Sequence, residues 1–167
     1  SLRPEDVDVI VFWTKNPAPL LPHLSELDAM GYRYYFQFTL TPYGRDVEPG
    51  LPKKSELVRT FQSLSQAIGH EKVVWRYDPI FLTEKYTADW HEAAFQELLE
   101  ALAPYTERCV ISFLDLYQKT EQNMKALGLL PMTTACMEDI ADRFSRAARG
   151  SGIDLRTCAE AIDLSRY

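Results

Sequence analysis

The chain has 167 residues, 46% of them hydrophobic and 25% charged, and an acidic excess that gives a net charge of −6. This composition is typical of a folded globular protein, and one domain spanning residues 1–167 can bury a full core. No apolar run approaches the roughly 18 residues that a membrane-spanning helix needs, and no signal peptide opens the chain. We therefore expect a cytoplasmic protein without a membrane partner, and the acidic balance argues against nucleic acid as a partner.

The cysteines and histidines form no recognised catalytic or metal-binding motif. Cys109, Cys136 and Cys158 lie 27 and 22 residues apart, and the three histidines are equally scattered. Zinc and iron–sulfur sites use closely spaced cysteines, so we expect no metal site and no resident cofactor within these 167 residues. An odd number of cysteines without a secretion signal fits reduced thiols in a cytosol.

Five short runs rich in β-branched and aromatic residues predict five β-strands. These runs are nearly continuously apolar, which is typical of strands buried on both faces in a parallel sheet. The predicted strands cover residues 7–13, 34–40, 73–77, 109–114 and 153–158.

Amphipathic stretches between these runs predict helices. Gly31, Gly69 and Gly150 are placed to end three of them, and Thr87 is placed to cap the start of another. A shorter helix is expected around residues 120–127, after the fourth strand. The other apolar stripes at helical spacing run over residues 20–27, 57–68, 91–102 and 137–148.

The regular alternation of strands and helices predicts an α/β fold with right-handed crossovers. Alternation alone does not separate a barrel from an open doubly wound sheet. No GxGxxG or GxxxxGK[ST] motif follows a strand, and polar residues gather at several strand ends, which favours a TIM-like (β/α) barrel. Five strand–helix units do not close an eight-stranded barrel. We therefore expect a partial parallel barrel, a fragment of a longer one, whose open edge allows self-association.

Polar residues at the ends of the first two strands are candidate site residues. Lys15 precedes Asn16-Pro17 at the end of the first strand, where it can hold an anionic substrate or form a Schiff base. Gln37 and Thr39 share one face of the second strand by period-two alternation, so they can orient a ligand. The structural alternatives are a solvated loop lysine and polar groups that satisfy one another inside the barrel.

Arg76 and Asp78 form the sharpest local pattern, because they lie two residues apart and share a face of the third strand. A charge pair on a buried strand is costly unless it is matched or binds something. Arg76 suits a carboxylate or phosphate, and Asp78 can orient it or accept a hydrogen bond from a ribose hydroxyl. A purely structural ion pair is the alternative.

The last two strand ends add further candidates. Lys119 follows the fourth strand, and Arg156, Cys158 and Glu160 share a face at the end of the fifth. Glu160 is a better candidate for chemistry than Cys158, since buried cysteines are usually inert. The long loop at residues 41–54, after the second strand, is also of a length that is often functional.

At these clusters the sequence resembles a bacterial family catalogued as domain of unknown function 1848. The resemblance covers essentially the whole chain. It implies members that are longer at both ends, with a C-terminal cysteine cluster similar to the iron–sulfur motif of radical S-adenosylmethionine (SAM) enzymes. It also implies a partial barrel of the radical SAM type, with SAM across the carboxyl ends of the strands. The matching stretches are residues 11–17, 35–40, 42–46, 74–80, 111–113, 115–117 and 157–160.

Three functions follow as hypotheses. In the first, the chain is the barrel core of a radical SAM-like enzyme with an unidentified small-molecule substrate, and the iron–sulfur cluster and SAM belong to the full-length protein. In this hypothesis SAM or the substrate is bound by Gln37, Thr39, Arg76 and Asp78. Substrate contact or proton transfer is the role of Lys15, Lys119 and Glu160. The second is a metal-free lyase or aldolase that uses Lys15, with an acid such as Glu160. The third is a non-catalytic module that binds a small molecule or a protein.

Overall fold

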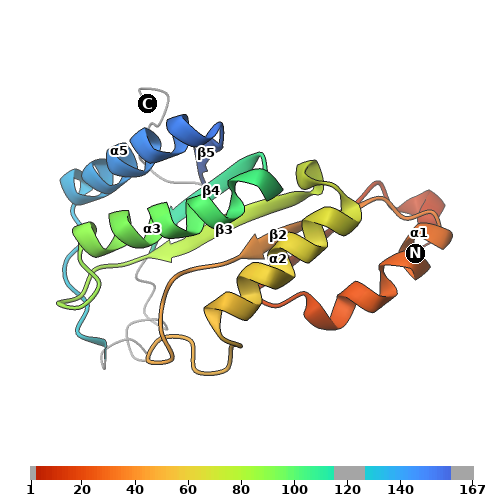
Figure 1. Ribbon diagram of the computed structural model, residues 1–167, viewed down its shortest axis with the longest axis horizontal. Coiled ribbons are helices and arrows are strands. Elements are labelled where there is room, and N and C mark those ends of the chain that lie inside the picture. Colours follow the sequence, from red (N-terminus) through yellow and green to blue (C-terminus); the bar gives the residue numbers. More distant parts are fainter. Residues whose placement is uncertain (1–2, 115–126, 159–167) are drawn as a thin grey trace.

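The computed structural model describes residues 3–114 and 127–158 and contains a parallel five-stranded sheet (Figure 1). The strands follow one another in the sheet in sequence order, and every neighbouring pair is parallel. The α/β fold expected from the sequence is confirmed. The strands are β1 (Ile10–Thr14), β2 (Tyr34–Thr39), β3 (Val73–Ile80), β4 (Arg108–Phe113) and β5 (Asp154–Thr157).

Helices connect successive strands, as the amphipathic stretches predicted. None of the helices in the described part of the chain is long and apolar enough to cross a bilayer. The short helix expected at residues 120–127 falls, apart from Leu127, outside the described residues. The α-helices are α1 (Leu24–Ala29), α2 (Lys54–Ile68), α3 (Ala88–Leu102) and α5 (Thr134–Ser151), and 3₁₀ turns cover Pro4–Asp6, Ala18–His23, His70–Lys72 and Ala103–Tyr105.

Two strands differ from the prediction by three residues at one end, and the other three differ by no more than one residue at either end. β1 begins three residues late, because pairing with the sheet starts where the Ile10 N–H donates to the Arg33 carbonyl at 2.8 Å. β3 continues three residues further, because it pairs with β4 again at Ile80 after a register shift that follows Tyr77. Because of this continuation, Asp78 is part of β3.

The helix ends follow the predicted signals with one correction. Gly31 and Gly69 adopt positive φ angles of 81° and 100° after α1 and α2. α5 ends at Gly152, with φ of 71°, rather than near Gly150, because the left-handed cap and its N–H bond to the Ala148 carbonyl come two residues later. The Thr87 hydroxyl caps α3 by accepting the Trp90 N–H at 3.2 Å, as predicted.

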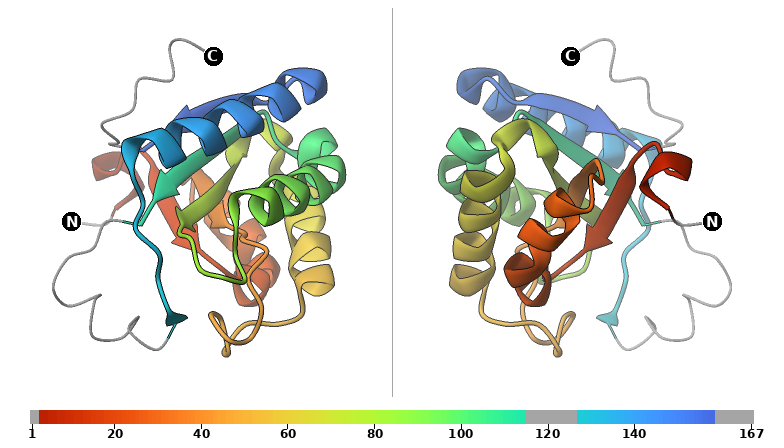
Figure 2. Two further views of the ribbon diagram at one scale, coloured as in Figure 1. Left: turned by 90° about the vertical axis from the view of Figure 1, so that its left-hand side faces the viewer. Right: turned by 90° about the vertical axis from the view of Figure 1, so that its right-hand side faces the viewer.

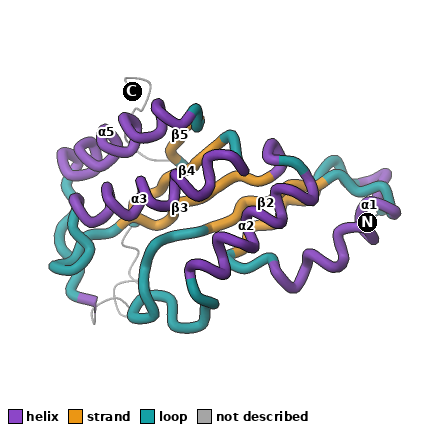
Figure 3. The backbone as a smooth tube through the Cα atoms, viewed as in Figure 1, coloured by secondary structure: helices purple, strands orange, loops and turns teal. Residues whose placement is uncertain are grey.

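The sheet curves, and the helices cover its convex side (Figures 2 and 3). Aromatic side chains fill the space between the two layers. Phe95 of α3 stacks on Phe144 of α5 with ring centroids 3.9 Å apart, and Trp75 of β3 stacks on Phe95 at 5.1 Å. The convex side of the sheet therefore faces the hydrophobic core, whereas these helices do not cover the concave side of the same strands.

Candidate functional site

The concave face of the sheet carries the polar residues that alternation assigned to it. Gln37 and the apolar Phe36 and Phe38 point to opposite faces of β2, and both phenylalanines are fully buried under the helices. The strand register places Gln37 beside Trp13 of β1 and Thr39 beside Arg76 of β3. Side chains at paired positions of a parallel sheet share a face, so the polar residues of three strands meet.

Arg76 is the centre of this arrangement. Its Nε and Nη2 donate to Asp78 Oδ2 at 3.2 and 2.7 Å, and its Nη1 donates to Gln37 Oε1 at 2.9 Å. The guanidinium carbon lies 4.2 Å from the centre of the Trp13 ring. We call Trp13, Gln37, Thr39, Arg76 and Asp78 the Arg76 cluster. The sequence predicts that Gln37, Arg76, Asp78 and Glu160 converge in one cleft. These contacts bring the first three together, and Glu160 lies outside the described residues.

The buried positive charge of Arg76 is balanced by the carboxylate of Asp78. The Arg76 side chain is 4% exposed and that of Asp78 is 20% exposed. Burial alone would lower the pKa of Arg76, but the hydrogen bonds and charge of Asp78 outweigh it and raise that pKa above its usual value. Cys158 raises the pKa of Arg76 in the same direction. The cation is thus held in a fixed position on the concave face.

Trp13 belongs to the cluster, although it was not among the candidate residues predicted from the sequence. Its Nε1 donates to Thr39 Oγ1 at 3.1 Å and one ring face covers Arg76, yet the residue is 61% exposed. An exposed indole that is held on one side by a cation and at its nitrogen by a hydroxyl is a preformed stacking surface. The sequence alone gave no signal for Trp13, because the register that pairs it with Gln37 is seen only in the structure.

A hollow of about 340 Å³ runs along the concave face from the Arg76 cluster. Its lining includes Val74 and Arg108, which lie near the amino ends of β3 and β4, so the hollow extends further from the carboxyl ends than we expected. This volume lies within the range of small-molecule sites. The complete lining consists of Tyr35, Gln37, Glu71, Val74, Arg76, Arg108 and Val110.

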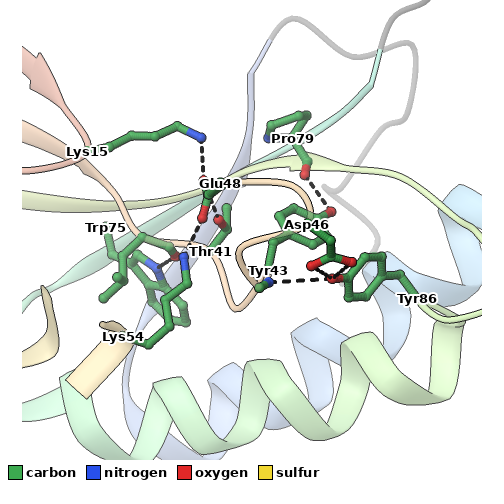
Figure 4. Close-up of polar contacts among 11 residues, drawn as sticks. Lys15, Thr41, Tyr43, Asp46, Glu48, Lys54, Trp75, Pro79 and Tyr86 are labelled. Carbon is green, nitrogen blue, oxygen red and sulfur yellow. Dashed lines mark hydrogen bonds and ion pairs between the residues drawn. The ribbon is translucent and has the colours of Figure 1, made fainter. Parts of the chain in front are cut away.

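A second polar group lies where β1 and β2 end, and its centre is Glu48 in the loop 41–54 (Figure 4). The Lys15 ammonium donates to Glu48 Oε1 at 2.5 Å, the Thr41 hydroxyl donates to the same oxygen at 3.0 Å, and Lys54 binds Oε2. The sequence-based hypothesis named Glu160 as an acid for Lys15. Glu160 lies outside the described residues, and among the described ones Lys15 pairs with Glu48. Sequence spacing gave no signal for the Glu48–Lys15 pair, because the two residues lie 33 positions apart in the chain.

The electrostatics of Glu48 keep it charged. Its side chain is 6% exposed, and this burial alone would raise its pKa. The hydrogen bonds and charges of Lys15 and Lys54 outweigh burial and lower the pKa below the usual value. Two ammonium groups therefore share one buried carboxylate.

The remainder of the loop 41–54 is anchored through aromatic side chains. The Tyr43 hydroxyl donates to the Pro79 carbonyl at 2.8 Å, and the Tyr86 hydroxyl donates to the Asp46 carboxylate at 2.8 Å (Figure 4). Tyr43 also stacks on Phe81 with centroids 4.5 Å apart. The loop thus has a small aromatic core of its own, which fixes Glu48 relative to β3.

Two of the predicted site residues, Lys119 and Glu160, lie outside the described residues. Cys109 is fully buried, and burial raises the pKa of its thiol well above the usual value. Within residues 3–114 and 127–158, no three His, Cys, Asp or Glu side chains are placed to hold a metal ion.

Comparison with known proteins identifies the family of this chain and a solved structure with a similar fold. No curated protein matches the chain. The fold is similar to that of a spore photoproduct lyase double mutant with bound AdoMet and dinucleoside spore photoproduct, a radical SAM enzyme, with a TM-score of 0.61 and 13% identity. The match covers 88% of this chain and 49% of that one, so the five parallel strands correspond to half of a radical SAM partial barrel. A family model described as "Domain of unknown function (DUF1848)" matches residues 1–167, and the chain belongs to that family.

Proposed function

We propose that this chain is the barrel core of a radical SAM-like enzyme and binds SAM on the concave face of its sheet. The observation that carries the proposal is the Arg76 cluster, a buried guanidinium held by Asp78 and Gln37 where parallel strands end. Ligands of parallel α/β barrels bind at that end, above the sheet. The likeness to a solved structure that contains AdoMet supports the choice of ligand.

The chemistry of the cluster fits the polar and aromatic parts of SAM. The Asp78 Oδ2 atom is engaged by Arg76, whereas Oδ1 has no partner among the described side chains and can accept from ribose hydroxyls or an ammonium group. The exposed face of Trp13 suits stacking against adenine. N–H groups of Arg76 beyond the three that bind Asp78 and Gln37 can donate to the SAM carboxylate.

The described cysteines do not fit an iron–sulfur cluster. Cys109 is buried in β4, Cys136 lies at the start of α5, and Cys158 follows β5, so the three thiols belong to separate elements. We therefore assign no electron-transfer step to these residues. The role that we propose for this chain is to bind and orient SAM and the substrate, and the cluster would come from elsewhere in the full-length protein.

SAM titration by isothermal calorimetry tests the proposal. We expect wild-type protein to bind SAM and Arg76→Ala to bind it about 10- to 150-fold more weakly, since a charge-assisted hydrogen bond contributes about 1.5–3 kcal/mol. Arg76→Lys keeps the charge without the planar fork and should fall between the two. Arg146→Ala is the matched control, because that arginine pairs with Asp142 on the exposed side of α5.

Circular dichroism and thermal melts establish that each variant is folded before affinities are compared. If Arg76→Ala does not fold, Gln37→Leu removes one ligand of the guanidinium and leaves the Arg76–Asp78 pair intact. SAM affinity that is equal in wild type and in a folded cluster variant would return Arg76 to a structural role. Absence of binding to the wild-type protein would overturn the assignment of SAM to this face.

A further inference from the structure

A second hollow, of about 190 Å³, lies between the loop 41–54 and the start of α2. It shares no lining residue with the concave-face hollow or with the Arg76 cluster, and the function proposed above does not use it. We call it the loop hollow. It is lined by Tyr43, Gly44, Arg45, Glu48, Leu51, Pro52, Lys53 and Lys54.

The lining of the loop hollow has an excess of positive charge. Arg45, Lys53 and Lys54 contribute three cations, and Glu48 is the one carboxylate among the lining residues. That carboxylate is already paired with Lys54 and with Lys15, which approaches from outside the hollow. Arg45 and Lys53 are exposed and have no ion pair within the described part of the chain. Two positive charges therefore face this space without a counter-charge.

The backbone that carries these cations is held in place by hydrogen bonds and packing. Lys54 occupies the first turn of α2, and its ammonium is held by the buried Glu48 carboxylate. The Glu48 N–H donates to the Gly44 carbonyl at 2.9 Å, which closes the turn that carries Arg45. Tyr43, next to this turn, is fully buried and bonded to the Pro79 carbonyl. Ligand binding would thus order few backbone groups, which lowers its entropic cost.

We propose that the loop hollow binds the phosphate group of a small molecule. A guanidinium donates two parallel hydrogen bonds to phosphate oxygens, and lysine ammonium groups add point charges. Two unpaired cations beside a third match a dianion better than they match a single carboxylate charge. The apolar wall formed by Leu51, Pro52 and Tyr43 offers a surface for the part of the molecule that carries the phosphate.

Calorimetric titration with inorganic phosphate at constant ionic strength tests this proposal, with acetate as the monoanionic comparison. We expect phosphate to bind at least tenfold more tightly than acetate. The double variant Arg45→Ala with Lys53→Ala should lose at least tenfold in phosphate affinity. Lys72→Ala with Arg149→Ala removes two exposed cations elsewhere, on a 3₁₀ turn and on α5, and should retain wild-type affinity.

Phenyl phosphate separates the two sources of the phosphate group. Tighter binding of phenyl phosphate than of inorganic phosphate supports an organic phosphate that contacts the apolar wall, and equal binding indicates recognition of free phosphate. Absence of phosphate binding by the wild-type protein would overturn the proposal. An equal loss in both double variants would overturn it too, because it would show attraction by net charge alone. Neither double variant touches the Arg76 cluster, so SAM affinity reports on the other proposal separately.

Discussion

The two faces of β2 and β3 have opposite chemistry although they belong to the same strands. On the convex face, Phe38 and Trp75 are fully buried and packed against helices. On the concave face, Gln37 and Arg76 occupy the alternate positions, and the Arg76 guanidinium donates to both Gln37 and Asp78. One sheet therefore provides a hydrophobic core on one side and a fixed cation on the other.

The difference indicates how stability and binding are divided in this fold. Burying apolar area stabilises the convex side, where helices exclude water from the strands. A buried ion pair contributes little net stability, since desolvation offsets its Coulombic attraction. We infer that changes on the convex face act mainly on folding, whereas changes on the concave face act mainly on ligand affinity. The following predictions test this division.

Phe95→Ala is expected to give the largest effect. Phe95 is fully buried between Trp75 and Phe144, with stacked contacts to both, so truncation leaves a cavity in the core. Phenylalanine truncations of this kind cost about 3–5 kcal/mol of unfolding free energy. Urea denaturation measures the loss. A change below about 1 kcal/mol would contradict the assignment of the convex face as the main source of stability.

Acidification should destabilise the protein through His91, which belongs to the convex core. Its Nε2–H donates to the Phe81 carbonyl at 2.9 Å and its Nδ1 accepts from the Tyr77 hydroxyl at 2.8 Å, so the imidazole is neutral. Burial lowers the pKa of His91 from 6.5 to about 4. The unfolded chain takes up this proton below pH 6.5 and the folded protein takes it up only near pH 4. Stability should therefore fall between pH 6.5 and pH 4, by up to about 3 kcal/mol.

The control for this effect is His91→Gln, whose amide can serve both hydrogen-bond partners without titrating. As the pH falls from 6.5 to 4, the unfolding free energy of wild type should decrease more than that of this variant. Carboxylates with lowered pKa values, such as Glu48 and Asp46, contribute equally to both proteins and cancel. A pH-independent difference would show that His91 does not titrate in this window.

Glu48→Gln tests the polar group at the ends of β1 and β2. The variant removes the negative charge shared by Lys15 and Lys54, and we expect a loss of about 1–3 kcal/mol of unfolding free energy. The loss should grow smaller as the pH falls below the pKa of Glu48, since wild type then loses the same charge. Glu97→Gln, on an exposed position of α3, is the matched control and should leave stability unchanged within about 0.5 kcal/mol.

Much of the fold and part of the candidate site followed from local patterns. Period-two alternation placed Gln37 with Thr39 and Arg76 with Asp78, because side-chain direction within one strand depends only on parity. The register between the strands then brings the two pairs together. Glu48 was missed, since its role depends on a loop that folds back over the sheet to reach Lys15, 33 residues away. Trp13 was missed for another reason: aromatic residues in an apolar strand are normally core, and only tertiary structure shows this one to be exposed.

Trp13→Ala should have the smallest effect on stability and so completes the comparison with Phe95→Ala. Both variants truncate a large aromatic ring, but Trp13 is 61% exposed and loses mainly its contact with Arg76, which is 4.2 Å away. Cation–π contacts at exposed sites contribute about 0.5–1 kcal/mol, and we expect a loss of that size in urea denaturation. SAM affinity should fall more than stability does, because the variant removes the stacking surface, and Trp13→Phe should restore part of it. A loss of stability as large as that of Phe95→Ala would contradict the division between the faces. Unchanged SAM affinity with a small stability change would preserve the division and remove Trp13 from the binding surface.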